Sequence, residues 1–297
     1  MRKLGVHIRT GGGLPAAARH AYEIGSTSYQ IMSGNPSAWN PGVLDARQAG
    51  EYRALVAEKK LGPVFLHAGY LINLSCRTGR NAPIYAKSIK LLQENIDRAA
   101  ILGCEYVVVH MGSRRGTAAD KALKALVEGI SRLYPTVADG QPDDTGPSGP
   151  PMLLLENSAG SGDTVGASFE ELEDVLSAAE DRGVIMPLGI CLDTAHMWGA
   201  GYDISSKKRV DIIVEEFDRH VGIDRLWLVH FNDSPVERGS KRDKHEHLGC
   251  GIIPMAGLRA FARHRKLYRV PLIMETPGNT SPTDEKRMAD LRALAGN

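Results

Sequence analysis

The feature that most restricts how this chain can fold is a series of eight short β-rich segments separated by longer amphipathic ones. Residues 106–110 (YVVVH) and 152–156 (MLLLE) are nearly continuous apolar runs, which is typical of strands buried on both faces. Residues 84–103 instead carry apolar side chains at intervals of three and four, which predicts a helix. This alternation predicts a parallel sheet covered by helices. The predicted strands cover residues 3–8, 28–32, 64–67, 106–110, 152–156, 188–193, 226–231 and 271–276.

Eight such units in 297 residues match the repeat number of a (β/α)8 TIM barrel, which is an α/β fold. A hydrophobic content of 42% is enough for one large core, so we expect a single domain over residues 1–297. Residues 137–151 are rich in Gly, Pro and Asp and lie between a predicted helix and a predicted strand. We therefore predict a flexible surface loop there, on the bottom face of the barrel.

Charge and composition exclude little about partners but do indicate a compartment. The formal net charge of +1 neither favours nor excludes a polyanionic partner. The basic N-terminus has no apolar stretch of signal-peptide length, and no segment approaches the ~20 apolar residues of a membrane span. We expect a soluble, cytoplasmic protein. Reduced thiols are predicted, because the four cysteines are scattered without a C-x-x-C pair: Cys76, Cys104, Cys191 and Cys250.

Seven of the eight predicted strands end on, or within one residue of, a side chain that can bind a metal. In a barrel of this type the C-terminal strand ends converge on one mouth, where catalytic groups sit. Ligands that are distant in sequence therefore become neighbours. These residues are His7, His67, His110, Glu156, Asp193, His230 and Glu275.

Each of these residues alone has a plainer explanation. A single histidine at a strand end is more often a hydrogen-bonded structural group, and Asp193 in LDTAH could be a helix N-cap. Acidic residues, however, are rarely buried unless they are paired or bind metal, and three of them close apolar strands. The coincidence favours metal binding. His7 is predicted to orient a ligand or a water molecule rather than to bind metal itself.

Two short pairs extend the set of donors, Asp193 with His196 and Asp243 with His245. Oxygen and nitrogen donors at this spacing suit zinc. His247 follows closely, and its side chain either joins these donors or points away. At about three to four protein ligands per zinc, with carboxylates bridging, nine donors imply two or three metals. The nine are His67, His110, Glu156, Asp193, His196, His230, Asp243, His245 and Glu275.

Six motifs follow one another along nearly the whole chain. They are HAGYLINL (67–74), VVHMGS (108–113), LLLENSAGSG (153–162), GICLDTAHMWGAGYD (189–203), HFNDS with GSKRDKHEHLGCG (230–251), and LIMETP (272–277). This series resembles the endonuclease IV family, the zinc-dependent apurinic/apyrimidinic endonucleases of base excision repair. Six ordered motifs make the resemblance far more specific than a lone short pattern.

The resemblance implies a role for each donor. One zinc ion would be bound by His67, His110 and Glu156. Glu156 would bridge to a second zinc and act as the catalytic residue that handles the proton of the attacking water. The second zinc would also be held by Asp193, His230 and Glu275, and the third by His196, Asp243 and His245. The implied reaction is hydrolysis of the phosphodiester 5′ to an abasic site, together with trimming of blocked 3′ ends. Manganese is a possible substitute for zinc.

The resemblance also implies contacts to duplex DNA. Tyr70 and Leu71 match residues that the family inserts into the DNA stack, although they could simply pack their loop onto the barrel. Asn35 matches a family position too. Ser37 stands where the family's usual arginine enters the DNA, so the affinity or the selectivity for abasic DNA is expected to differ from the family's. Basic residues after the strand ends would contact phosphates, or form a solvated cluster: Arg77, Arg80, Arg114, Arg115, Lys241, Arg242 and Lys244.

Two other functions fit parts of the pattern. Related barrels include sugar isomerases and epimerases, which bind one or two divalent metals through the same residue types. The pair of Asp243 and His245 separates the two functions, because only the nuclease needs a third metal. A non-enzymatic DNA-binding module would not need nine converging ligands. Cys250 replaces an acidic residue common in the family, with no predicted consequence, and the resemblance implies a monomer.

Overall fold

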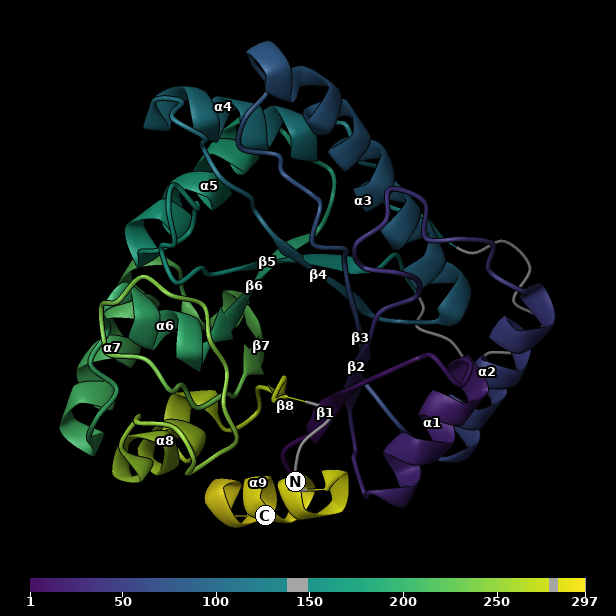
Figure 1. The fold of residues 1–297 in the computed structure, drawn as a ribbon, viewed down its shortest axis with the longest axis vertical. Coiled ribbons are helices and arrows are strands. Elements are labelled where there is room, and N and C mark those ends of the chain that lie inside the picture. Colours follow the sequence, from purple (N-terminus) through teal and green to yellow (C-terminus); the bar gives the residue numbers. More distant parts are fainter. Residues whose placement is uncertain (138–148, 278–282, 297) are drawn as a thin grey trace.

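The computed structural model describes residues 1–137, 149–277 and 283–296. Eight parallel strands form a closed barrel in sequence order, and β8 returns to pair with β1. Figure 1 shows this ring of strands at the centre of the molecule. The predicted (β/α)8 TIM barrel is therefore confirmed. The strands are β1 (Leu4–Ile8), β2 (Tyr29–Ile31), β3 (Val64–His67), β4 (Tyr106–His110), β5 (Met152–Glu156), β6 (Leu188–Asp193), β7 (Leu226–His230) and β8 (Leu272–Met274).

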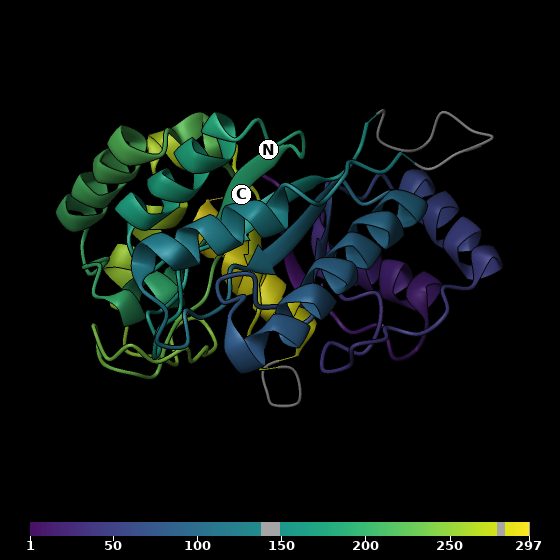
Figure 2. The same ribbon diagram turned by 90° about the horizontal axis from the view of Figure 1, so that it is seen from above.

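Helices surround the ring of strands, as Figures 1 and 2 show from two directions. Short polar side chains begin several of them. Asp45, for example, accepts a hydrogen bond from the backbone N–H of Gln48, and Ser168 accepts one from that of Glu171. The helices are α1 (Leu14–Glu23), α2 (Ala46–Glu58), α3 (Ala82–Leu102), α4 (Ala119–Ile130), α5 (Phe169–Asp181), α6 (Thr194–Ala200), α7 (Lys207–His220), α8 (Met255–Ala262) and α9 (Asp284–Ala295).

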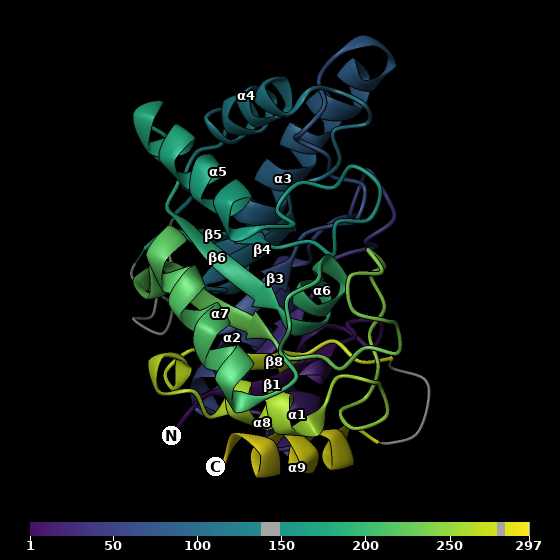
Figure 3. The same ribbon diagram turned by 90° about the vertical axis from the view of Figure 1, so that its left-hand side faces the viewer.

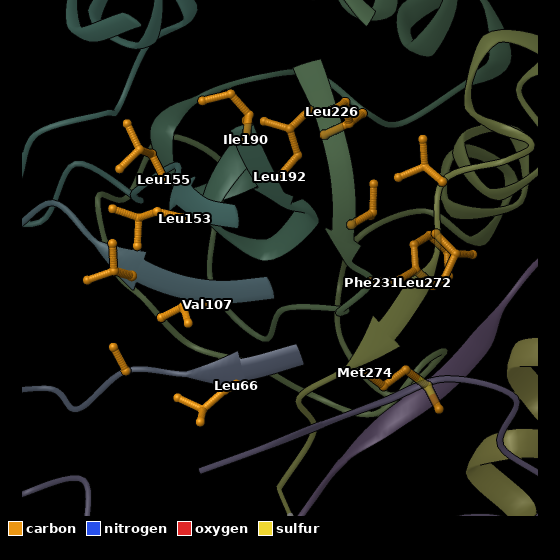
Figure 4. Close-up of a cluster of buried hydrophobic side chains, with 14 of the residues drawn as sticks. Leu66, Val107, Leu153, Leu155, Ile190, Leu192, Leu226, Phe231, Leu272 and Met274 are labelled. Atoms are coloured by element: carbon orange, nitrogen blue, oxygen red, sulfur yellow. The ribbon is translucent and has the colours of Figure 1, made fainter. Parts of the chain in front are cut away.

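Side chains alternate along each strand between the helices and the interior of the barrel. Figure 4 shows Leu153 and Leu155 of β5 on the outer side of the ring, where they pack in the large core. The intervening Leu154 belongs to a separate inner layer, made of Phe65, Val108, Leu154, Cys191, Leu228 and Ile273. Two residues further along the same strands, the next inward positions are His67, His110, Glu156, Asp193, His230 and Glu275. The alternation thus aims all six side chains into the mouth.

Three expectations concern other parts of the chain. Of the predicted loop at 137–151, residues 138–148 lie outside the described residues. The structure describes no helix long and apolar enough to cross a membrane. All four cysteines are free, as predicted, with Cys76, Cys104 and Cys191 buried and Cys250 exposed.

Candidate metal centre

The register of neighbouring strands determines which donors lie side by side at the barrel mouth. His110 at the end of β4 lies opposite Glu156 of β5, and Asp193 of β6 lies opposite His230 of β7. Paired residues in a parallel sheet point to the same side, on strands about 4.8 Å apart. The pairing therefore brings each of these donors next to one on the adjacent strand.

Glu156 lies at the centre of the cluster and is only 1% exposed. Its Oε2 atom lies 3.2 Å from His67 Nε2 and 3.5 Å from His110 Nε2. Its Oε1 atom lies 2.8 Å from His230 Nδ1. The donor atoms of His67, His110 and Glu156 are all within 4.8 Å of one another, which is close enough to share one metal ion.

A second group overlaps the first at Glu156. Donor atoms of Glu156, Asp193, His230 and Glu275 also lie within 4.8 Å of one another. Within this group His230 Nδ1 is 3.2 Å from Glu275 Oε2. Three carboxylates and one imidazole therefore meet at the end of the barrel.

The third group combines a helix with a loop. Asp193 is the N-cap of α6 and accepts a hydrogen bond from the His196 backbone N–H at 2.8 Å, so it serves as a helix cap as well as a possible ligand. Asp243 Oδ1 lies 3.2 Å from His196 Nε2 and 3.4 Å from His245 Nε2. Donor atoms of Asp193, His196 and His245 form a further set within 4.8 Å. Asp193 therefore touches both the second and the third group.

Four histidines use one ring nitrogen in a hydrogen bond to a carbonyl oxygen and turn the other toward the cluster. A ring N–H that donates to a carbonyl leaves the opposite nitrogen with a lone pair, as a metal ligand requires. The pairs are His67 Nδ1 with Ala68 O (2.8 Å), His196 Nδ1 with Asn157 O (3.0 Å), His230 Nε2 with Gln30 Oε1 (2.8 Å) and His245 Nδ1 with Glu275 O (3.2 Å).

Two further observations fit a bound cation. Within the described residues, the buried Nε2 atoms of His196 and His245 lie close to Asp243 Oδ1 but outside hydrogen-bond geometry, although buried polar atoms normally have a partner. The same part of the chain gives the four carboxylates of the cluster ion pairs to histidines alone. Neutral imidazoles would leave their charge uncompensated, and divalent cations would balance it.

The pKa values show how strongly these groups interact. Burial would raise the pKa of Glu156, but His110 and His230 hold it well below its usual value. Burial would lower the pKa of His196, but the carboxylates of Asp193 and Asp243, with Glu156, raise it to about 10. Partial desolvation would raise the pKa of the exposed Asp243 carboxylate, but the neighbouring histidines lower it to about 2. Without metal, these carboxylates and imidazoles hold one another as ion pairs.

The cluster opens into a cleft of about 1200 Å³. His67, His110 and His196 line it together with Asp243 and other donors, whereas the deeper Glu156, Asp193 and His230 do not. His7 also lines the cleft, and its Nδ1 atom lies 3.6 Å from Oε1 of the predicted ligand Glu275. An extended substrate can therefore reach the exposed edge of the cluster.

Three polar residues of the site were not identified from the sequence. Gln30, fully buried in β2, contacts His230, His7 (2.9 Å) and Glu275 through its side-chain amide. Asn157 accepts a hydrogen bond from the Asp193 backbone N–H at 2.6 Å, and Asn232 donates to the Asp193 side chain at 2.6 Å. The motifs LLLEN and HFND place both asparagines directly beside the donors, which is the signal that could have found them.

Two of the four predicted DNA contacts line the cleft. Tyr70 and Asn35 line the cleft, and the Tyr70 backbone N–H donates to Pro36 O at 2.9 Å, which joins their two loops. Leu71 is half-buried and Arg242 is exposed, and neither lines the cleft. Ser37 is exposed, and its backbone N–H donates to the Asn35 side chain.

His247 lies two residues beyond His245 but outside the donor cluster. His247 is buried, and burial together with nearby Arg287 lowers its pKa. None of the candidate metal-binding groups among the described residues includes it. His247 therefore does not join the candidate metal donors that precede it.

The closed barrel and the donor cluster at its mouth define the class of protein. A family model described as the xylose isomerase-like TIM barrel matches residues 18–295. A solved D-tagatose 3-epimerase-like protein has a TM-score of 0.68 at 18% identity, covering 99% of this chain and 97% of that chain, which shows a common fold alone. The chain is a xylose isomerase-like TIM barrel.

Two relatives with higher identity narrow the assignment. The probable endonuclease 4 of Methanoculleus marisnigri is 36% identical over 293 residues, 99% of both chains. The crystal structure of endonuclease IV from Thermus thermophilus has a TM-score of 0.81 and 32% identity, again over 99% of both chains. The chain belongs to the endonuclease IV family.

Proposed function

We propose that this protein is a DNA repair endonuclease. It would hydrolyse the phosphodiester on the 5′ side of abasic sites in duplex DNA and leave 3′-hydroxyl and 5′-deoxyribose phosphate ends. Membership of the endonuclease IV family supports a hydrolase that cleaves DNA. The observation that carries the proposal is the convergence of nitrogen and oxygen donors in three overlapping groups beside an open cleft.

Three zinc ions would be held by these groups. When bound, they would activate a water molecule, neutralise the phosphate oxygens and stabilise the leaving 3′ oxygen. The same donors suit manganese as a substitute. The proposed sets are His67, His110 and Glu156 for the first ion; Glu156, Asp193, His230 and Glu275 for the second; and His196, Asp243 and His245 for the third.

Glu156 is the proposed catalytic residue among the protein groups. Its two oxygens face different histidines, with Oε2 toward His67 and Oε1 toward His230, so the carboxylate lies between the first two donor sets. A carboxylate in this position can accept the proton of an attacking water. Its burial keeps other water away from that proton transfer.

The rim of the cleft would bind the duplex. Tyr70 is 62% exposed although it is a large aromatic residue, and such side chains can enter a kinked DNA stack beside an extruded nucleotide. Leu71 would support this insertion, Asn35 would contact the strand in the cleft, and Arg242 would contact a phosphate. Ser37 supplies no positive charge at the rim, so we expect weaker affinity for abasic DNA than an arginine would give.

Several finer proposals follow from the same site. The same donors would also trim blocked 3′ ends, because that reaction is again hydrolysis of a phosphate ester beside the cleft. All proposed ligands belong to one chain, which supports a monomer acting through a single domain over residues 1–297. We also propose that this enzyme acts in the cytoplasm, which its membership of a family of DNA-cleaving enzymes supports.

The alternative function is that of a divalent-metal sugar or sugar phosphate isomerase or epimerase. The epimerase-like structure supports this alternative through the fold alone. The third donor group argues for the nuclease, since an enediolate reaction needs no third metal. Asp243 and His245 are therefore the residues whose metal content best separates the two functions.

The first test is cleavage of a labelled duplex carrying one tetrahydrofuran abasic analogue, without added magnesium, by protein of known metal content. The analogue cannot undergo β-elimination, so a cut must be hydrolytic. We expect incision on the 5′ side and a 3′ end that a polymerase extends, with no cut by chelator-treated protein. An intact duplex after incubation with fully metallated protein would reject the proposal, and sugar phosphates would be assayed next.

A further inference from the structure

Residues 234–253, between β7 and α8, form a long connection that we name the ligand loop, because it carries Asp243 and His245. Figure 3 shows this yellow-green segment beside α6. Within it there is only one isolated bridge, from Glu246 to Asp233, and no regular helix or strand. A loop without such structure would sample many conformations unless other contacts restrict it.

Asp233 makes such contacts at the neck of the ligand loop, where the two ends of the loop, at residue 234 and residues 249–253, meet. It lies three residues beyond the end of β7 and is completely buried. Its carboxylate accepts four backbone N–H hydrogen bonds, which is an unusually complete set for one side chain. Oδ1 accepts from Ser234 (2.7 Å) and Ile253 (3.1 Å), and Oδ2 accepts from Gly249 (3.0 Å) and Gly251 (3.0 Å).

Further hydrogen bonds close the same neck. The Glu246 backbone N–H donates to Asp233 O at 2.9 Å, and the Ile252 N–H donates to Ser234 O at 2.8 Å. The Ser234 hydroxyl donates to Lys244 O at 2.7 Å. Lys244 lies between Asp243 and His245 in the sequence, so this hydrogen bond restrains the backbone next to both donors.

The sequence LGCG is suited to this carboxylate. A Cβ at Gly251 would lie 2.3 Å from Asp233 Oδ1, and Gly249 has a φ of +81°. Glycine is therefore required on both sides of Cys250, while Cys250 itself is exposed. This explains why residue 250 can depart from the family pattern without a structural consequence.

We propose that Asp233 is a positioning residue that orders the ligand loop before metal binds, so that Asp243 and His245 meet His196 at the third donor group. The proposal rests on the proposed assignment of that group to a zinc ion. The other donors lie on strand ends or on α6, which the barrel holds in place. The loss of the Asp233 carboxylate therefore weakens one metal site and leaves the other two.

The test is Asp233→Asn in the full chain, since an amide NH2 would oppose two of the four N–H donors. In metal-free protein, trypsin cleavage after Arg238, Lys241, Arg242 or Lys244 should become roughly 10-fold to 100-fold faster, because buried donors without partners favour opening. Metal analysis after equilibration in a zinc buffer should give two zinc ions per chain instead of three. Excess zinc should restore the third ion and the protection, because binding to the ordered loop offsets the cost of ordering it.

Controls separate this role from general damage. Cys250→Ala, in the same turn, should leave tryptic protection and zinc content unchanged. Asp243→Asn should lose the third zinc but keep its metal-free ligand loop protected. Gly251→Ala provides a second variant in case Asp233→Asn does not fold, and it should show the same two effects.

The outcomes distinguish the inference from the function on which it rests. Normal tryptic protection and three tightly bound zinc ions in Asp233→Asn would overturn the positioning role, and so would an equal loss of all three ions. Unaltered protein that binds fewer than three zinc ions would instead overturn the proposed metal assignment. The tryptic comparison of metal-free proteins still decides the role of Asp233 in that case.

Discussion

The donors at the strand ends and the donors on the ligand loop differ in what holds them in place. His67, Glu156 and His230 are buried at the ends of strands whose backbones pair on both sides. Asp243, by contrast, is 54% exposed and lies on a loop that the Asp233 carboxylate closes and that backbone hydrogen bonds from Gly239 and Lys241 join to α6. One half of the site is therefore as rigid as the barrel, while the other depends on a few contacts that single substitutions can remove.

The largest effect should come from the strand-end half. Glu156→Gln should reduce the incision rate roughly 10³-fold or more, since it removes the proposed proton acceptor and a ligand shared by two sites. Single-turnover cleavage of the tetrahydrofuran duplex and zinc analysis measure both effects. Wild-type rates in a folded Glu156→Gln protein would remove Glu156 from the mechanism.

The matching change in the loop half is His245→Ala, or Asp243→Ala. Either should empty the third site and abolish cleavage, while the first two sites stay occupied because their ligands lie elsewhere. Circular dichroism should show an unchanged fold, and metal analysis should show the loss of one ion. Full activity in either variant would mean that the third group is not part of the active site.

A smaller effect is expected at Gln30, whose side chain contacts the strand-end donors His230 and Glu275. Gln30→Leu leaves His230 Nε2 without its carbonyl acceptor and Glu275 without a donor, so zinc affinity at the second group should fall about 10-fold to 100-fold. Competition against a zinc chelator measures this affinity. An unchanged second site would show that the strands alone orient these ligands.

The smallest effect concerns the metal-free protein. Burial would lower the pKa of His196, but the carboxylates of Asp193, Asp243 and Glu156 raise it from the ordinary 6.5 to about 10. A raised pKa in the folded state stabilises the fold below pH 6.5, and this contribution is lost as the pH rises toward 10. Thermal melting in chelator should therefore show a lower Tm at high pH, with a smaller decrease in Asp243→Asn. Parallel curves for the two proteins would reject the pairing of Asp243 with His196.

The residues of the site that the sequence predicts differ from those that it does not predict in how far along the chain their partners lie. The strand-end donors follow apolar runs directly, so Glu156 in MLLLE can be recognised from its neighbours in sequence. No neighbouring residue in SYQIM indicates that Gln30 belongs to the site, because its hydrogen-bond partner His230 is 200 residues away in the sequence. The role of Asp233 is likewise not predicted from the sequence, because its carboxylate accepts hydrogen bonds from N–H groups up to 20 residues further along the chain.

The sequence by itself determined the eight strands, the closed barrel and the set of candidate metal donors, because period-two alternation and residue type are local properties of the chain. The tertiary structure alone decided how the donors are shared. It placed Glu156 between two groups, made Asp193 both a helix cap and a candidate ligand, and excluded His247. The reason is geometric: barrel closure and strand register determine which distant side chains meet, and neither can be read from a single segment.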